Sequence, residues 1–128
     1  MIKKEKFNIE YVFDKASLTN LWNFISTPSG LSEWFADDVS MDGNIYGFTW
    51  DGHSTKAEII GTNPGNYIRF RWLEDKDLPV YFEFRLHKIE LTGGIMLEIT
   101  DFAEEEEKED VMNLWESEVK VLKRILGL

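Results

Sequence analysis

The spacing of apolar residues changes along this chain, and that change limits the folds that the chain can adopt. Residues 5–13 alternate between apolar and polar side chains, as a strand with one buried face does. From residue 14 to about 36 the apolar residues recur at helical spacing, and after residue 36 they alternate again. Helical spacing returns near residue 104. The pattern therefore predicts a β-sheet combined with helices at both ends of the sequence.

Turn-forming residues divide the middle of the chain into short segments. Extended segments are expected at residues 37–42, 45–50, 54–61, 66–73, 80–90 and 94–102. Asp-Gly, Pro-Gly and Gly-Gly steps lie between most of them, and a polar loop covers residues 74–79. Six strands joined by five short connections predict an antiparallel meander.

Two short helices are expected before the meander. Asp14 is a candidate N-cap of the first, which should end near Ser26 because Thr27 precedes a proline and so avoids the α region. Thr27 is itself a good N-cap, and Pro28 fits the first position of a second helix that carries Trp34.

A long helix is expected over about residues 105–126. Trp115, Val119 and Leu122 share one stripe of this segment. Acidic residues gather at its start and basic residues at its end, and both charges oppose the helix dipole. The acidic run is explained by the dipole and a solvated surface, with a docking site for a basic partner as the alternative. Residues 1–128 are thus predicted to form a single α+β domain.

Several short aromatic motifs connect this order of elements to a known family. They are Leu21–Ile25 with Pro28, Leu31 and Trp34, then Gly47–Trp50, then Asn63–Trp72. With these motifs the chain resembles the START-like superfamily, also called Bet v 1-like, helix-grip or SRPBCC. Within it, the chain is similar to the family typified by the activator of Hsp90 ATPase C-terminal domain. The resemblance implies a helix-grip fold, in which a seven-stranded antiparallel sheet bends around the last helix.

Composition excludes several classes of function. The 128 residues include no cysteine and two histidines, and the net charge is −10. No thiol nucleophile or cysteine-ligated metal site is possible, and an acidic chain is a poor partner for nucleic acid or anionic membranes. No apolar stretch approaches the ~20 residues of a membrane span, so we expect a cytoplasmic protein without membrane insertion.

The polar residues form no recognisable catalytic or metal-binding pattern. His53 is expected in a hairpin turn, and His87 on the solvent face of its strand. Glu83, Arg85 and Glu98 are assigned to the same solvent face, where cross-strand ion pairs are ordinary. We therefore expect no enzyme activity, no metal and no cofactor.

Aromatic side chains are the informative feature, with nine Phe, five Trp and four Tyr. By strand parity many of them share the sheet face that meets the last helix, where they predict either a filled core or a ligand pocket. The candidate ligand-binding residues are Trp34, Tyr46, Trp50, Phe70, Trp72, Phe82, Phe84, Met112 and Trp115.

These residues favour non-catalytic binding of a small apolar or amphipathic molecule, lipid-like or aromatic, between the last helix and the curved sheet. The alternative is a protein-interaction module of co-chaperone type with a filled core. An enzyme of the cyclase or hydrolase kind would need polar groups inside the cavity, and the sequence offers few.

Overall fold

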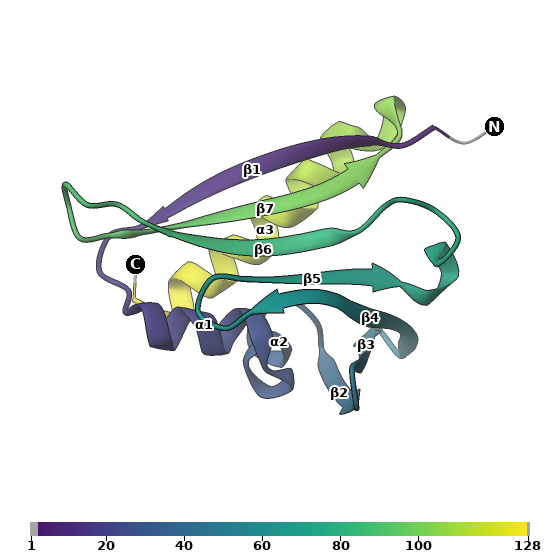
Figure 1. The fold of residues 1–128 in the computed structure, drawn as a ribbon, viewed down its shortest axis with the longest axis horizontal. Coiled ribbons are helices and arrows are strands. Elements are labelled where there is room, and N and C mark those ends of the chain that lie inside the picture. The colour runs from purple at the N-terminus through teal and green to yellow at the C-terminus, as the bar shows by residue number, and fades with distance from the viewer. Residues whose placement is uncertain (1–2, 128) are drawn as a thin grey trace.

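The computed structural model describes residues 3–127, which form one seven-stranded antiparallel sheet and the helices that pack against it (Figure 1). The strands are β1 (Glu5–Phe13), β2 (Asp38–Asp42), β3 (Ile45–Trp50), β4 (His53–Asn63), β5 (Tyr67–Trp72), β6 (Phe82–Lys88) and β7 (Ile95–Ala103). The α-helices are α1 (Leu18–Ser26), α2 (Pro28–Trp34) and α3 (Lys108–Ile125), and the short 3₁₀ turns are η1 (Leu73–Asp75) and η2 (Glu105–Glu107). This α+β order confirms the predicted helix-grip fold.

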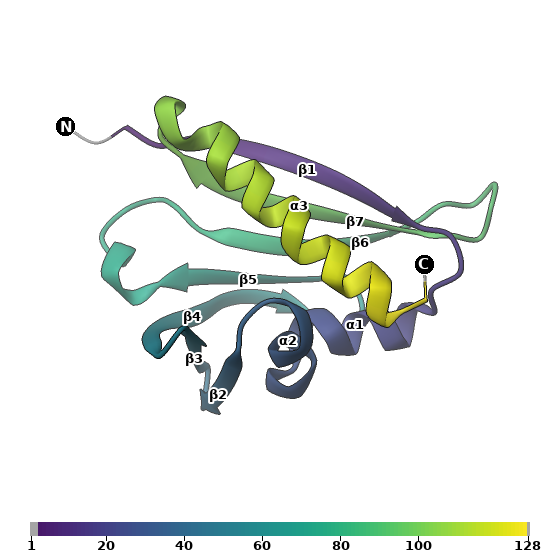
Figure 2. The same cartoon turned by 180° about the vertical axis from the view of Figure 1, so that it is seen from behind.

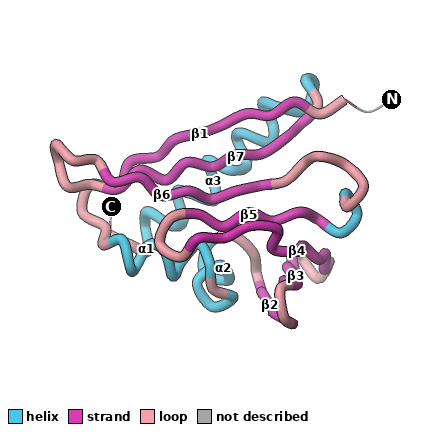
Figure 3. Tube along the Cα trace, viewed as in Figure 1, coloured by secondary structure: helices cyan, strands magenta, loops and turns pink. Residues whose placement is uncertain are grey.

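Strand order in the sheet is β1-β7-β6-β5-β4-β3-β2 (Figure 3). Strands β2 to β7 therefore form the predicted meander, and β1 is added at its far edge beside β7. Two strands differ from their predicted bounds by more than one residue at an end, since β4 is longer by three residues in all and β6 begins at Phe82 and ends at Lys88. The ends of β2, β5 and β7 differ from the prediction by at most one residue. The pairing of β4 with β5 shifts between Ile59 and Gly61, so a bulge bends the sheet there.

Helices α1 and α2 are joined by one capping residue. The N-cap of α1 is Ser17 and not Asp14, because Asp14 lies in the turn after β1 and the Ser17 hydroxyl accepts from the Asn20 N–H at 3.0 Å. Thr27 ends α1 and starts α2. Its hydroxyl donates to the Asn23 carbonyl at 2.7 Å and accepts from the Gly30 N–H at 3.0 Å.

Gly30 allows the two helices to approach closely. A Cβ at this position would overlap the Asn23 carbonyl oxygen and the Phe24 Cα, which are backbone atoms of α1. The packing of α2 on α1 therefore requires glycine here.

Helix α3 crosses one face of the sheet, with its start near the open ends of β1 and β7 and its end near α1 (Figure 2). Trp115, Val119 and Leu122 are buried against the sheet, as predicted from their shared stripe. The helix begins at Lys108 because the preceding acidic residues form η2. No helix in residues 3–127, α3 included, is long and apolar enough to cross a membrane.

The outer face of the sheet carries an ion-pair cluster. Glu83 was predicted to face solvent, but it is 4% exposed because two arginines cover it. Its carboxylate accepts from Arg69 at 2.8 Å and from Arg85 at 3.1 Å, and the Arg69 guanidinium lies 4.0 Å from the Tyr81 ring centre. His87 remains at the surface and contacts Glu98 at 2.9 Å.

Candidate functional site

The rings predicted to face the last helix pack on one another and fill the centre of the domain. Phe70, Phe82 and Phe84 are 0–1% exposed. The centres of Phe70 and Phe82 lie 5.0 Å apart in a stacked pair, and those of Phe82 and Phe84 lie 5.9 Å apart, edge to face. These separations are the favourable ones for aromatic pairs, so the rings act as a packed core.

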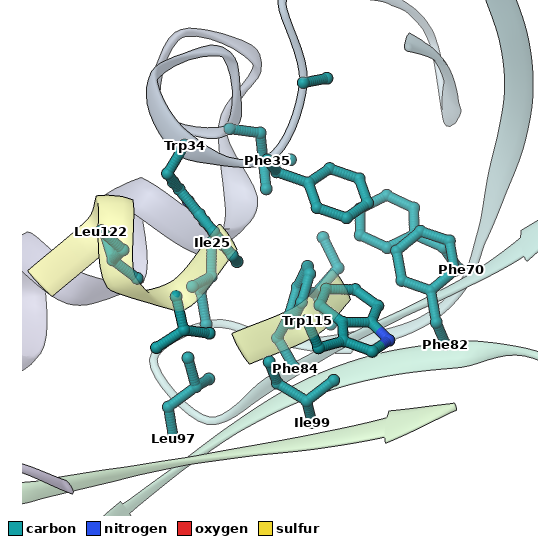
Figure 4. Close-up of a cluster of buried hydrophobic side chains, with 14 of the residues drawn as sticks. Ile25, Trp34, Phe35, Phe70, Phe82, Phe84, Leu97, Ile99, Trp115 and Leu122 are labelled. Atoms are coloured by element: carbon teal, nitrogen blue, oxygen red, sulfur yellow. The ribbon is translucent and has the colours of Figure 1, made fainter. Parts of the chain in front are cut away.

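Trp115 connects helix α3 to this cluster (Figure 4). Its ring stacks on Phe35 with a centroid distance of 5.4 Å and meets Phe84 edge to face at 5.7 Å. The indole N–H donates to the Asp101 carboxylate at 2.8 Å. Burial raises the pKa of Asp101, and the bonds from Trp115 and from the Phe102 N–H oppose that rise.

A surface groove with a volume of about 490 Å³ lies between α2, β3 and α3, and it is more open to solvent than enclosed. We name it the α2–α3 cavity; its lining residues are Ser32, Glu33, Trp34, Phe35, Ala36, Asp37, Trp50, Leu114, Glu118 and Val121. The two tryptophans are held by their indole N–H groups. Trp34 donates to the Phe24 carbonyl and Trp50 to the Phe35 carbonyl, both at 2.8 Å. With its N–H groups already bonded, this wall offers mainly apolar contact.

Glu118 places a carboxyl group in the wall of the α2–α3 cavity. Its Oε2 is buried and has no hydrogen-bond partner among residues 3–127. Burial, with a smaller contribution from the nearby Asp101 carboxylate, raises the pKa of Glu118 to about 8. At neutral pH the empty cavity therefore holds a largely protonated carboxylic acid.

A smaller cavity of about 180 Å³ lies at the other end of α3. Its lining residues are Lys4, Trp72, Asp75, Val80, Tyr81, Asp101, Phe102, Ala103, Glu107 and Val111. Lys4 and Asp75 form an ion pair at 3.8 Å across it. The Trp115 ring separates the two cavities, since it stacks on Phe35 of one lining and bonds to Asp101 of the other.

The structure distributes the nine predicted residues among three environments. Trp34 and Trp50 line the α2–α3 cavity, and Trp72 lines the smaller one. Phe70, Phe82, Phe84 and Trp115 lie in the ring cluster, with Met112 partly buried at its edge.

Tyr46 is the ninth predicted residue, and it too is buried. Its hydroxyl donates to the Ser26 carbonyl at 2.7 Å, which ties β3 to α1. Thr49, on the same strand as Tyr46, forms a hydroxyl–hydroxyl hydrogen bond with Ser54 at 2.7 Å.

Sequence reasoning missed Glu118. Its position carried a signal, because it lies three residues after Trp115 and four before Leu122, within the apolar stripe of α3. A carboxyl group placed inside such a stripe is either paired or in an unusual environment.

Comparison with known proteins supports the fold at two levels. The START-like superfamily domain matches residues 1–128. The solution structure of BfR322 from Bacteroides fragilis is 41% identical with a TM-score of 0.71, covering 99% of this chain and 94% of that one.

More distant structures share the fold alone. The Aha1 dimer from Colwellia psychrerythraea is 18% identical with a TM-score of 0.75 and 93% coverage of both chains. CalU16 from Micromonospora echinospora is 19% identical with a TM-score of 0.71, covering 94% of this chain and 73% of its own.

A shorter similarity connects the chain to Jeltraxin from Lepidobatrachus laevis. It is 36% identical over 47 residues, which are 36% of this chain and 20% of Jeltraxin. The chain thus spans about a fifth of that relative. The match to the superfamily over its full length, together with the observed helix-grip architecture, shows that this chain belongs to the START-like superfamily.

Proposed function

We propose that this domain binds a small apolar or amphipathic molecule in the α2–α3 cavity and performs no chemistry on it, acting in the cytoplasm. The observation that carries the proposal is the cavity itself, about 490 Å³ in volume, whose lining combines aromatic and aliphatic side chains from α2, β3 and α3 with a few acidic ones. Ligand sites in proteins have this volume and this mainly apolar lining. Binding would then be driven by the apolar area that the ligand removes from water.

The ring cluster has a supporting role in this proposal. Phe82 and Phe84 pack behind Phe35, which stacks on Trp115. A wall that is held on both sides keeps its shape when a ligand enters, and a preformed wall lowers the entropic cost of binding. Among the predicted binding residues, Trp50 is partly exposed and would contact the ligand directly, whereas Trp34 is 5% exposed and would mainly support the wall.

A filling variant tests the proposal. Leu114 lines the cavity and is 61% exposed, so Leu114→Trp would occupy the cavity without entering the core. Ile125→Trp is the matched control, because Ile125 is 42% exposed on the same helix and does not line the cavity.

Naphthalene-based ligands are suitable probes, since a two-ring body fits the cavity, and binding raises the melting temperature by mass action. We expect saturable thermal shifts for the wild type and Ile125→Trp and reduced shifts for Leu114→Trp. Equal shifts in all three proteins would place binding elsewhere, and no shift with any apolar probe would reject the proposal.

The alternative is a protein-interaction module of co-chaperone type. Two observations favour it: the rings between α3 and the sheet fill the space that a carrier would leave open, and the Aha1 dimer shares the fold. Native mass spectrometry of the protein purified from its own host separates the two functions. A co-purified small molecule supports binding in the cavity, and a stoichiometric protein partner supports the interaction module.

A further inference from the structure

The α2–α3 cavity contains a carboxyl group that the fold itself does not use. Glu118 projects from α3 among apolar neighbours, and its Oε2 has no hydrogen-bond donor within the described part of the chain. An unpaired buried polar oxygen destabilises a folded protein, because it has lost water and gained nothing in return. Because Oε2 is buried below the cavity surface, a ligand would meet the carboxyl group through the part that lines the cavity and would offset that cost by pairing with it.

The other ionisable groups at the cavity are all acidic. Glu33 on α2 and Asp37 in the segment after it line the cavity at exposed positions, and Asp101 on β7 lies close enough to raise the pKa of Glu118. Strand β3 contributes the uncharged Trp50. Among the described residues that line the cavity none is Lys or Arg, so no side chain there neutralises a carboxylate.

The aromatic part of the wall suits the same kind of ligand. Trp50 is partly exposed, and its indole N–H is already bonded. Its ring stacks on Phe48 and meets Phe35 edge to face, so the exposed remainder of the ring is the part that can contact a ligand. The face of a tryptophan ring attracts cations more strongly than that of any other side chain. An anionic ligand would meet three carboxyl groups and an electron-rich ring, all of which oppose it.

We propose that the ligand of the α2–α3 cavity is an amphipathic organic cation, whose apolar body lies against Trp50, Leu114 and Val121 and whose ammonium group pairs with Glu118. This inference rests on the proposed function and narrows it to one chemical class. An ammonium group supplies both the donor and the charge that the site lacks, and such charge-assisted bonds are about twice as strong as neutral ones.

Binding of a cation would be coupled to the release of a proton. The raised pKa of about 8 means that Glu118 is largely neutral in the empty cavity at pH 7. When the ammonium group arrives, the carboxylic acid gives its proton to solvent and becomes the carboxylate of an ion pair. The ligand keeps its own proton, because alkylamines titrate near pH 10. About one proton therefore leaves for each cation bound at pH 7.

Three ligands of matched shape and different charge test the inference. Naphthylethylamine is cationic, naphthylethanol is neutral and naphthylacetate is anionic. Isothermal titration calorimetry at pH 7, in two buffers of different ionisation enthalpy, measures affinity and proton release together. We expect the amine to bind about 10-fold more tightly than the alcohol, with the acetate weakest. Proton release should approach one at pH 7 and vanish as the pH rises past about 8.

Two variants assign the effect to a residue. Glu118→Gln should bring the amine-to-alcohol affinity ratio close to one and abolish proton release. Glu116→Gln removes the same charge from an exposed position on the same helix and should keep both the ratio and the release. If Glu118→Gln does not fold, the wild type alone still tests the inference. Proton release that does not vanish as the pH rises past about 8 would contradict the pairing of the ammonium group with Glu118.

The remaining outcomes distinguish failure of the cation inference from failure of the proposed function. Equal affinity for the three ligands, or preference for the acetate, overturns the cation inference and leaves the proposed function intact. A preference for the amine that survives Glu118→Gln assigns it to the overall acidity of the protein and also overturns the inference. Failure of all three ligands to bind rejects the proposed function itself.

Discussion

At the scale of single residues, Trp115 has two separate roles. Its ring fills space between Phe35 and Phe84, and its N–H donates to the partly buried carboxyl group of Asp101. The first role is hydrophobic and depends on ring area, whereas the second is polar and depends on one hydrogen atom. Substitutions can separate the two.

Trp115→Ala should lower the free energy of unfolding by about 3–5 kcal/mol, because it leaves a cavity in the core. Trp115→Phe keeps an aromatic ring but leaves Asp101 without its indole donor, and we expect a smaller loss of about 1–3 kcal/mol. Urea unfolding measures both values. A loss below about 1 kcal/mol for Trp115→Ala would show that the ring contributes little to packing.

Glu118 gives the protein a pH dependence of stability with a defined sign. Its pKa rises from an ordinary 4.5 to about 8 on folding, so the folded state holds the proton more tightly than the unfolded state. The favourable contribution is complete below about pH 4.5 and is lost as the pH rises to about 8. The raised pKa of Asp101 acts in the same direction.

We expect the free energy of unfolding to fall by on the order of 3 kcal/mol across this range, and Glu118→Gln to remove most of the fall. Urea melts from pH 5 to 9 provide the measurement, with Glu116→Gln as the control. An identical pH profile for Glu118→Gln and wild type would contradict the assignment.

Glu83 changes the free energy of unfolding with pH in the opposite direction to Glu118, and it does so in a lower pH range. Burial by itself raises the pKa of Glu83, but the bonds and charges of Arg85 and Arg69 outweigh burial and lower it. Its contribution is therefore present at neutral pH and is lost as the pH falls below about 4.5. The two effects occupy different ranges and do not mask each other.

At the scale of elements, the contact between α1 and α2 depends on the missing side chain of Gly30. Gly30→Ala should lower the free energy of unfolding by about 1–3 kcal/mol, because the new methyl group meets backbone atoms of α1 that cannot move independently. Ser29→Ala changes the neighbouring, exposed residue of α2 and should have little effect.

Thermal unfolding of both variants tests this contact. Because α2 carries Trp34, Gly30→Ala should also weaken binding in the α2–α3 cavity. If Gly30→Ala were as stable as the wild type, α1 and α2 would be able to move apart without a loss in the free energy of unfolding.

The elements were largely predictable because their signals are local. Turn residues marked the ends of each strand, and the Thr27–Pro28 step marked the boundary between α1 and α2. The errors also have local causes. Ser17 displaced Asp14 as the N-cap because the turn after β1 extends further than expected, and both residues are good caps by type.

The environment of particular side chains was less predictable, because it depends on contacts between distant segments. Strand parity put Glu83 on the outer face correctly, but the arginines that bury it come from β5 and from β6 itself. Strand parity likewise predicted that the aromatic rings share one face of the sheet. It could not indicate whether these rings fill the space under α3 or leave a cavity there. The α2–α3 cavity could not be predicted, since its walls come from segments up to 89 residues apart, Ser32 to Val121.

At the scale of the whole molecule, stability should be distributed unevenly across the sheet. Strand β2 has five residues, four of them exposed, and is paired on one side. Strands β6 and β7 are paired on both sides and lie under α3. Native-state hydrogen exchange should therefore show β2 amides exchanging by local opening and β6–β7 amides near the global free energy of unfolding. Uniform protection of all strands would contradict this gradient.

The pairing of β1 with β7 has a consequence for synthesis of the protein. Glu5 pairs with Ala103, and β1 has no other neighbour in the sheet of residues 3–127. On the ribosome β1 emerges before the other strands of this sheet, and its partner follows more than 80 residues later, a delay of roughly 5–20 s at ordinary elongation rates. During that time Phe7 and Ile9 are exposed on a strand with two open edges. The charged residues beside them, Lys6 and Glu10, are of the kind that discourages pairing with a neighbouring nascent chain.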